Sequence, residues 1–175
     1  QSLYPDSATD DHVQAGTGSS CQVCHWGPNG GPSWNAYGWR IREFLNAGDR
    51  QWGKKMHDDL LDAAGWAVKQ GFADPKRIAI LGGSYGGFAA LAGAAFTPDF
   101  FRCAVDIVGP SNIFTLIKTI PPYWAPLRAR FDKRVGNVDD PKDQGLLRAA
   151  SPLFAADRIR IPLLIAQGAN DPRVK

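Results

Sequence analysis

The sequence is poor in several features that would assign it to a specialised class of protein. No apolar run approaches the roughly 18–20 residues of a membrane-spanning helix, so we expect no membrane span. Lys and Arg outnumber Asp and Glu by only 20 to 17, an excess too small to indicate nucleic acid or a membrane surface as a partner. The three cysteines do not provide a disulfide framework. What remains is a chain with 44% hydrophobic residues, a composition typical of a globular protein.

Residues 1–42 have almost no branched aliphatic side chains and are rich in Gly, Ser, Asp, Asn and Trp. Their branched aliphatic residues are Leu3, Val13, Val23 and Ile41. So few cannot form a hydrophobic core, and we predict a loop-rich segment over 1–42. The alternation of helical and apolar patterns that follows predicts one α/β domain over 43–175.

Apolar and amphipathic stretches alternate from Glu43 onward. Met56, Leu60 and Ala64 recur at helical spacing, which predicts a helix over 54–70. The other predicted helices cover 85–96, 112–120, 125–134 and 141–149, and the predicted strands cover 77–81, 103–108 and 161–166. Strands that are apolar throughout and separated by helices indicate a parallel sheet with helices on both faces. We expect the three strands to be neighbours in their chain order.

The sequence Gly-Gly-Ser-Tyr-Gly-Gly over 82–87 has the setting of a nucleophile elbow, with a predicted strand before it and a Gly- and Ala-rich helix after it. This sharp turn exposes the serine hydroxyl, and it needs glycines because side chains there would collide with the strand or the helix. The pattern indicates Ser84 as a candidate nucleophile and the backbone N–H of Tyr85 as a candidate donor to an oxyanion. The alternative is a Gly-rich turn that only packs closely.

A second chemical pattern follows the third predicted strand. The apolar residues up to Ala166 lead into a Gly-containing turn and then Asp171. In α/β-hydrolases the triad acid follows the nucleophile at the end of a later strand, where it holds a histidine in the required tautomer. Asp171 is therefore a candidate triad acid, although an Asp is also a common turn residue. Parallel strands would bring Ser84 and Asp171 to the same edge of the sheet.

Five segments, in this order, resemble the catalytic domain of the prolyl oligopeptidase family of serine peptidases, most of all its acylaminoacyl peptidase and dipeptidyl peptidase branch. They are residues 44–53, 56–60, 82–87, 106–111 and 167–174. The resemblance implies a partial α/β-hydrolase fold, a Ser-Asp-His triad with Ser84 as nucleophile and Asp171 as acid, a peptide or acyl-peptide substrate and no cofactor. It also implies a pocket for the substrate residue before the cut bond, formed by Ile113, Phe114, Ile117, Tyr123 and Trp124.

The sequence departs from the family pattern at the histidine. The family's histidine follows its acid, whereas the histidines of this sequence all precede Ser84: they are His12, His25 and His57. We therefore expect the chain to be a piece of the family's domain, with its catalytic histidine beyond Lys175. We also expect residues 1–175 alone to be inactive. His57 lies in a segment that resembles a helix of the family, so we interpret it as structural.

Cys21-Gln-Val-Cys24-His25 is the pattern of covalent haem c attachment, in which two thiols bind the haem and the histidine ligates the iron. Haem c here would favour a periplasmic or secreted location, and without it a cytoplasmic location is compatible. A zinc site would need a fourth ligand from His12 or Cys103, and a thioredoxin-like redox pair would need a βαβ context that is lacking. A chance match is the remaining alternative. Cys103 has apolar neighbours, and we expect it to be buried.

Three functions from different classes stay open. The first is a serine peptidase domain, and the second is a haem c electron-transfer segment fused or misassembled onto an inactive hydrolase piece. The third is a hydrolase fold without activity of its own. We favour the first, because the strand, the elbow and the small-residue helix coincide at Ser84. The substrate preference and the oligomeric state do not follow from the sequence.

Overall fold

The computed structural model describes residues 44–174, in which helices and strands alternate. Residues 44–47 are helical, and the helices that follow are α4 (Lys55–Lys69), α5 (Tyr85–Phe96), α6 (Ile113–Lys118), α7 (Ala125–Arg134) and α8 (Gln144–Ala150). The strands are β1 (Ala79–Gly83), β2 (Cys103–Ile107) and β3 (Leu163–Ala166), and three short 3₁₀ helices are η1 (Pro122–Trp124), η2 (Pro141–Asp143) and η3 (Pro152–Arg158). The predicted helices over 54–70, 85–96 and 125–134 are confirmed to within one residue at each end.

The three strands form one parallel sheet in the order β1-β2-β3, which confirms the predicted order. Gly82 in β1 pairs with Asp106 in β2, and Asp106 pairs with Ile165 in β3. Because the strands run in the same direction, the segments that follow them leave the sheet at one edge. Ser84 directly follows β1 and Asp171 lies in the turn after β3, so both candidate catalytic residues belong to this edge.

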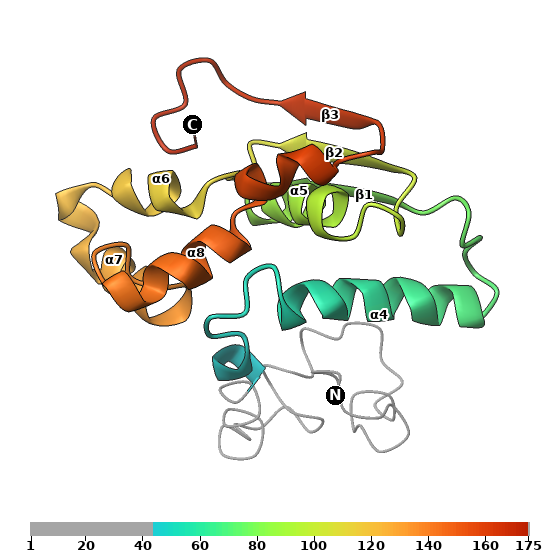
Figure 1. Ribbon diagram of the computed structural model, residues 1–175, viewed down its shortest axis with the longest axis horizontal. Helices are drawn as coiled ribbons and strands as arrows, with labels where there is room; N and C mark the ends of the chain where they lie inside the picture. Colours follow the sequence, from blue (N-terminus) through green and yellow to red (C-terminus); the bar gives the residue numbers. More distant parts are fainter. Residues whose placement is uncertain (1–43, 175) are drawn as a thin grey trace, which may run out of the picture.

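Helix α5 packs against β1 and β2 and covers one face of the sheet, with α4 on the far side of α5 (Figure 1). Residues 87–95 of α5 are all buried and most of them are Gly or Ala. Small side chains let the helix approach the sheet closely. A Cβ on Gly93, for example, would lie only 2.9 Å from the ring of Phe101.

The opposite face of the sheet carries large apolar side chains that stay exposed. Leu81 in β1 is 69% exposed and Leu164 in β3 is 58% exposed, and both are neighbours of Val105 of β2 in the register. The expectation of helices on both faces of the sheet is therefore wrong for the part of the chain that the structure describes. We call the surface formed by Leu81, Val105 and Leu164 the bare sheet face.

The expectation of a buried Cys103 is also wrong, for the same reason. Cys103 is half-buried and pairs with Ala79, which is exposed. The next residue, Ala104, points to the face covered by α5 and is only 1% exposed. Successive side chains of a strand point to opposite faces, so the apolar neighbours of Cys103 could not decide which face is covered.

The main hydrophobic core lies beside α5, among the helices that follow β2. Its buried members are Phe88, Ala92, Ile113, Ile117, Val135, Val138, Leu147 and Ala150. The buried hydroxyl of Ser151 joins two of these helices, since it accepts the Ile113 N–H at 3.0 Å and donates to the Leu147 carbonyl at 2.7 Å. The core is thus anchored on α5, the helix that begins directly after Ser84.

Candidate active site

Ser84 connects β1 to α5 with a strained backbone. Its φ of 56° and ψ of −115° lie in a region that costs a residue with a side chain on the order of 1–3 kcal/mol. Two hydrogen bonds hold this conformation: the Ser84 N–H donates to the Ile107 carbonyl at 2.9 Å, and the Ser84 carbonyl accepts from the Phe88 N–H at 3.0 Å. The residue is exposed, and its hydroxyl makes no hydrogen bond that caps the helix. Its Oγ atom is therefore available for reaction.

Gly82 of the elbow is required by a close backbone contact. A Cβ on Gly82 would overlap the backbone of Gly86, which lies on the first turn of α5. The strand before Ser84 and the helix after it thus touch through their backbones, as the sequence pattern predicts. A side chain at position 82 would force the strand and the helix apart and would open the turn at Ser84, whereas a Cβ on Gly86 meets nothing within 4 Å.

Tyr85 is the first residue of α5, and its side chain is held away from the elbow. The ring packs against Trp52 with 4.8 Å between centroids, and the hydroxyl donates to the sulfur of Met56 at 3.8 Å. Burial raises the pKa of Tyr85 to about 12, so the phenol does not transfer protons near neutral pH. The backbone N–H, in contrast, belongs to the first turn of the helix, where N–H groups have no acceptor within the helix.

Asp171 lies in a tight turn after β3. Its Oδ1 atom accepts hydrogen bonds from the backbone N–H groups of Val174 at 2.9 Å and Arg173 at 2.7 Å. These hydrogen bonds, that of Val174 first, lower the pKa of Asp171. The carboxyl group is therefore ionised at neutral pH, which is the state that a triad acid needs in order to accept a hydrogen bond from an imidazole.

Arg173 ties the turn of Asp171 to the segment after α6. Its guanidinium donates to the Thr119 carbonyl at 2.7 Å, and the Thr119 hydroxyl donates to the Arg173 carbonyl at 2.9 Å. The guanidinium also lies over the ring of Trp124, 4.7 Å from its centroid. Figure 1 shows the chain after β3 turning back toward α6. Sequence reasoning missed Thr119 and Arg173, since no local pattern indicates a contact across 54 residues.

Two of the five candidate pocket residues line a hollow. Tyr123 and Trp124 are 80% and 42% exposed, and with Pro126 and Leu127 they border an open cavity of about 360 Å³. Phe114 is half-buried and packs against the core. The remaining two residues, Ile113 and Ile117, are 0% exposed members of the core.

The inclusion of Ile113 and Ile117 in the pocket therefore needs correction. Both residues lie on α6, a helix of six residues, four positions apart. Residues at this spacing share one face of a helix, and that face is turned to the core. Ile113 and Ile117 pack in the core beneath the segment that carries Tyr123 and Trp124. A substrate does not reach the side chains of Ile113 and Ile117.

His57 is held far from Ser84. It is 5% exposed, and its Nε2 atom lies 2.9 Å from the Thr97 hydroxyl oxygen. That hydroxyl donates to the Gly93 carbonyl, so Nε2 must be the donor to Thr97. Thr97 follows the last residue of α5, whereas Ser84 precedes the first, a separation of about 20 Å along the helix. The interpretation of His57 as structural agrees with this contact.

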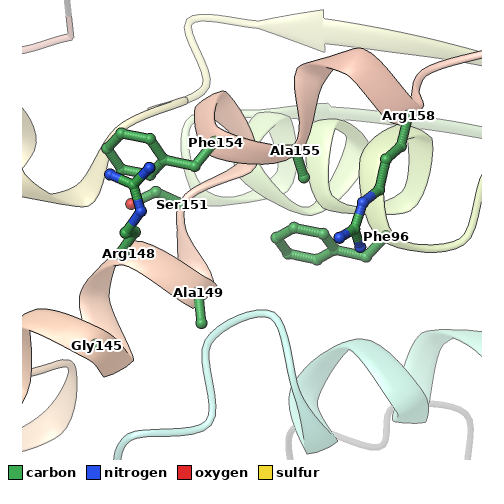
Figure 2. A pocket seen from close by; sticks show the side chains of 8 residues that line it. All are labelled: Phe96, Gly145, Arg148, Ala149, Ser151, Phe154, Ala155 and Arg158. Atoms are coloured by element: carbon green, nitrogen blue, oxygen red, sulfur yellow. The ribbon is translucent and has the colours of Figure 1, made fainter.

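A second cavity lies apart from these residues, between α8, η3 and the end of α5 (Figure 2). It has a volume of about 350 Å³ and includes Arg148 and Arg158 in its lining. The Arg148 guanidinium lies 4.1 Å from the centroid of the Phe154 ring. Neither Ser84 nor Asp171 borders this cavity, so it is not part of the candidate active site.

The candidate haem ligands Cys21, Cys24 and His25 lie outside the described residues, and haem attachment there stays a prediction. Within residues 44–174, no group of three or more His, Cys, Asp or Glu side chains could hold a metal ion. In that part of the chain no helix is both long enough and apolar enough to cross a membrane.

Comparison with known proteins assigns this arrangement to a family. A model of the prolyl oligopeptidase family matches residues 36–175. The chain belongs to this family. Its members are serine peptidases with an α/β-hydrolase catalytic domain, so the predicted family and the predicted partial α/β-hydrolase fold are confirmed, although one face of the described sheet carries no helix.

Individual relatives agree with the family assignment. The chain is 56% identical to dipeptidyl aminopeptidase BIII of Pseudoxanthomonas mexicana over 134 residues, which are 77% of this chain and 19% of that enzyme. It is 50% identical to dipeptidyl peptidase family member 6 of Caenorhabditis elegans, over 77% of this chain and 18% of the relative. The structure of a Mycobacterium tuberculosis puromycin-hydrolyzing peptidase matches with a TM-score of 0.66 and 34% identity, over 76% of this chain and 19% of that chain. The chain thus spans about a fifth of the length of these relatives.

Proposed function

We propose that this chain carries the nucleophile and the acid of a serine peptidase that hydrolyses peptide bonds. Ser84 is the nucleophile and Asp171 is the triad acid. One observation carries the proposal: a strained, exposed Ser84 and an ionised Asp171 follow parallel strands out of the same edge of the sheet. In open α/β sheets this edge is where active sites lie.

The reaction begins at the Ser84 hydroxyl. Its oxygen attacks the carbonyl carbon of the substrate while its proton passes to a general base, and the negative charge moves to the carbonyl oxygen. The Tyr85 N–H at the start of α5 is the proposed donor to that oxyanion, in a place where the helix end also favours negative charge. The amine then leaves with the proton from the base. Water attacks the carbonyl carbon of the acyl group while its proton passes to the base, and the bond to the Ser84 oxygen breaks as that oxygen takes the proton back.

The general base is a histidine outside residues 44–174. His57 is the histidine among these residues, and its bond to Thr97 places it at the far end of α5. The Asp171 carboxylate would accept the N–H of the catalytic imidazole, fix its tautomer and stabilise the imidazolium that forms. All of these steps use acid–base groups and backbone N–H groups, so the proposal includes no cofactor.

The proposed substrates are peptides. The open cavity beside Tyr123 and Trp124 offers aromatic surface to the residue before the cut bond. Two relatives that share at least half of their aligned residues with this chain are named dipeptidyl aminopeptidase BIII and dipeptidyl peptidase family member 6. These names support the release of dipeptides from peptide substrates as the reaction of the site when it includes the catalytic histidine.

A chimera tests the proposed function. Residues 44–174 of this chain would replace the matching segment of the Pseudoxanthomonas mexicana enzyme, which supplies the remaining parts of a complete protein of this family. We expect the chimera to hydrolyse dipeptidyl nitroanilides. In this chimera, Ser84→Ala should lower kcat by about 10⁴-fold or more, and Asp171→Asn by about 10⁴-fold.

Ser111→Ala is the matched control, because it removes a hydroxyl that has no role in the proposed chemistry. Its kcat should stay within about threefold of the parent chimera. A folded chimera without activity would contradict the proposal, and so would one whose activity survives Ser84→Ala.

A further inference from the structure

Asp106 is a buried acid that the proposed mechanism does not use. It lies in β2, directly beside Gly82 in the register, and is only 2% exposed. Acidic side chains are almost never this deeply buried unless they are paired. No ion pair of Asp106 occurs among residues 44–174. The hydrogen bond that its carboxyl group accepts comes from the backbone N–H of Gly109, at 2.8 Å.

The carboxyl group of Asp106 fits against two glycines. A Cβ on Gly87 would overlap its Oδ1 atom, and so would a Cβ on Gly109. A Cβ on Gly109 would also overlap the backbone of Gly87. Gly87 is the third residue of α5, so Asp106 contacts both the turn that leaves β2 and the first turn of the helix that follows Ser84.

The turn over 106–109 bonds to Ser84 and to the end of the strand that precedes Asp171. The carbonyl of Ile107, inside this turn, accepts the N–H of Ser84 at 2.9 Å. The next residue, Val108, donates its N–H to the carbonyl of Ala166 at 2.8 Å, at the end of the strand that leads to Asp171. The same turn thus fixes the backbone of the nucleophile and the exit of β3.

The backbone of Val108 needs support from its surroundings. Its φ of 51° is a genuine outlier for a β-branched residue, and such conformations persist only where neighbouring contacts hold them. The Asp106 carboxyl supplies one of these contacts, because its bond to the Gly109 N–H closes the turn around Val108. Burial raises the pKa of Asp106, and the carboxyl accepts this bond in either protonation state.

We propose that Asp106 is a positioning residue of the nucleophile elbow, which acts by closing the turn over 106–109 and thereby holding the carbonyl of Ile107 against the N–H of Ser84. The proposal rests on the proposed function for its catalytic consequence. Its structural part concerns the elbow alone and does not depend on activity. Asp106→Asn keeps the acceptor oxygen and the shape of the side chain, whereas Asp106→Ala removes both.

Hydrogen exchange of the full 175-residue chain tests the structural part. Asp106→Ala should raise the exchange rates of peptides over 82–88 and 103–110 by at least tenfold, since their amide bonds depend on the closed turn. Asp106→Asn should leave these rates within about threefold of the parent. If Asp106→Ala does not fold, Asp106→Val replaces it in the same experiment. Valine also removes the acceptor for the Gly109 N–H, and it suits a strand, so the same rise in exchange rates is expected.

Asp143→Ala provides the matched control. Asp143 is another buried acid, 6% exposed, and it accepts the Asn137 N–H at 2.8 Å and pairs with Arg50. Its loss should raise exchange around 137–147 and leave the elbow peptides unchanged. The proposal would be overturned if the peptides over 82–88 and 103–110 exchanged at the same rate in Asp106→Ala as in the parent chain. It would also be overturned if Asp143→Ala raised the exchange rates of these peptides as much as Asp106→Ala does.

Kinetics of the chimera test the catalytic consequence. Asp106→Ala should lower kcat by about 10–100-fold with KM within about threefold, because a small displacement of the nucleophile affects the chemical step more than binding. Asp106→Asn should keep kcat within about threefold, and Asp143→Ala should not change it. An unchanged kcat in Asp106→Ala would overturn the positioning role. If the parent chimera is inactive, the proposed function fails, while the exchange experiment still decides the role of Asp106.

Discussion

Ser84 combines a strained backbone with a hydroxyl that has no structural task. A serine before a helix ordinarily accepts an N–H of the first turn, but the positive φ of Ser84 turns its side chain out of reach of these groups. The strain is maintained by hydrogen bonds of its own backbone to Ile107 and Phe88. Part of the stability of the fold therefore offsets the backbone strain that keeps this hydroxyl exposed at the sheet edge.

His57 makes the stability of the fold depend on pH. Burial lowers its pKa below 6.5, and this effect exceeds the opposing influence of Asp58. The buried Nδ1 atom has no hydrogen-bond partner in the described part of the chain, so a proton there would have no acceptor. At pH values between the lowered pKa of His57 in the folded chain and 6.5, the unfolded chain binds more protons than the folded chain. The free energy of unfolding therefore decreases as the pH falls through this range.

We predict that the free energy of unfolding of the 175-residue chain decreases from pH 7.5 to pH 5 more steeply than that of His57→Gln. The difference should be on the order of 1 kcal/mol for each unit by which the pKa of His57 is lowered. Urea titrations at several pH values measure both curves, and His12 and His25 contribute equally to the two proteins. Parallel curves would show that His57 does not titrate differently on folding.

At the residue scale, the sequence predicts those features that a local pattern encodes. Ser84 follows from its setting between a strand and a small-residue helix, and Asp171 from its place after a later strand. The contact between Thr119 and Arg173 joins segments 54 residues apart, and no local pattern encodes it. The half-buried Cys103 was not predictable because apolar neighbours do not tell which face of a strand is covered.

At the element scale, α5 is the part of the fold best predicted from the sequence. The elbow at Ser84 determines where the helix begins, and Thr97 precedes a proline, which disfavours a further helical residue. The strands are less well predicted, since β1 and β3 each begin two residues later than the apolar pattern indicates. Arg77 is still part of a turn, where its N–H donates to the Asp74 carbonyl, and Pro162 has no N–H for a strand ladder.

Two glycine-to-alanine substitutions test the close packing of α5. Gly93→Ala would place a Cβ 2.9 Å from the Phe101 ring, and overpacking of this kind costs about 1–3 kcal/mol. Gly65→Ala is the matched change within α4, where a Cβ meets nothing within 4 Å. It should stabilise the fold by about 0.5–1 kcal/mol through helix propensity. Denaturant unfolding measures both, and an equal effect of the two substitutions would contradict the close approach of α5 to the sheet.

At the scale of the whole molecule, the bare sheet face stands out. Parallel sheets occur almost only where both faces are covered, yet Leu81 and Leu164 are 69% and 58% exposed. This face was not predictable from the sequence, because its strands have the uniformly apolar character of strands that are covered on both sides. An apolar surface of this kind favours association.

We predict that the 175-residue chain associates reversibly through the bare sheet face. Leu81→Thr together with Leu164→Thr should weaken this association about tenfold or more, since full burial of a leucine side chain contributes about 1.5–3 kcal/mol and a tenfold change in Kd corresponds to about 1.4 kcal/mol. Sedimentation velocity over a range of concentrations measures the effect. Leu153→Thr, at a residue of η3 that is 48% exposed, is the control and should not change the association. A strictly monomeric parent chain would contradict the prediction.

The central claim, that the elbow presents Ser84 as the nucleophile, is tested most directly by covalent labelling. The chimera would be treated with a fluorophosphonate, which reacts with activated serines, and the modified residue would be located by peptide mapping. We predict one label, on the peptide that contains Ser84, and its complete loss in Ser84→Ala with no label appearing elsewhere. A label on another serine of an active, folded chimera would show that Ser84 is not the nucleophile.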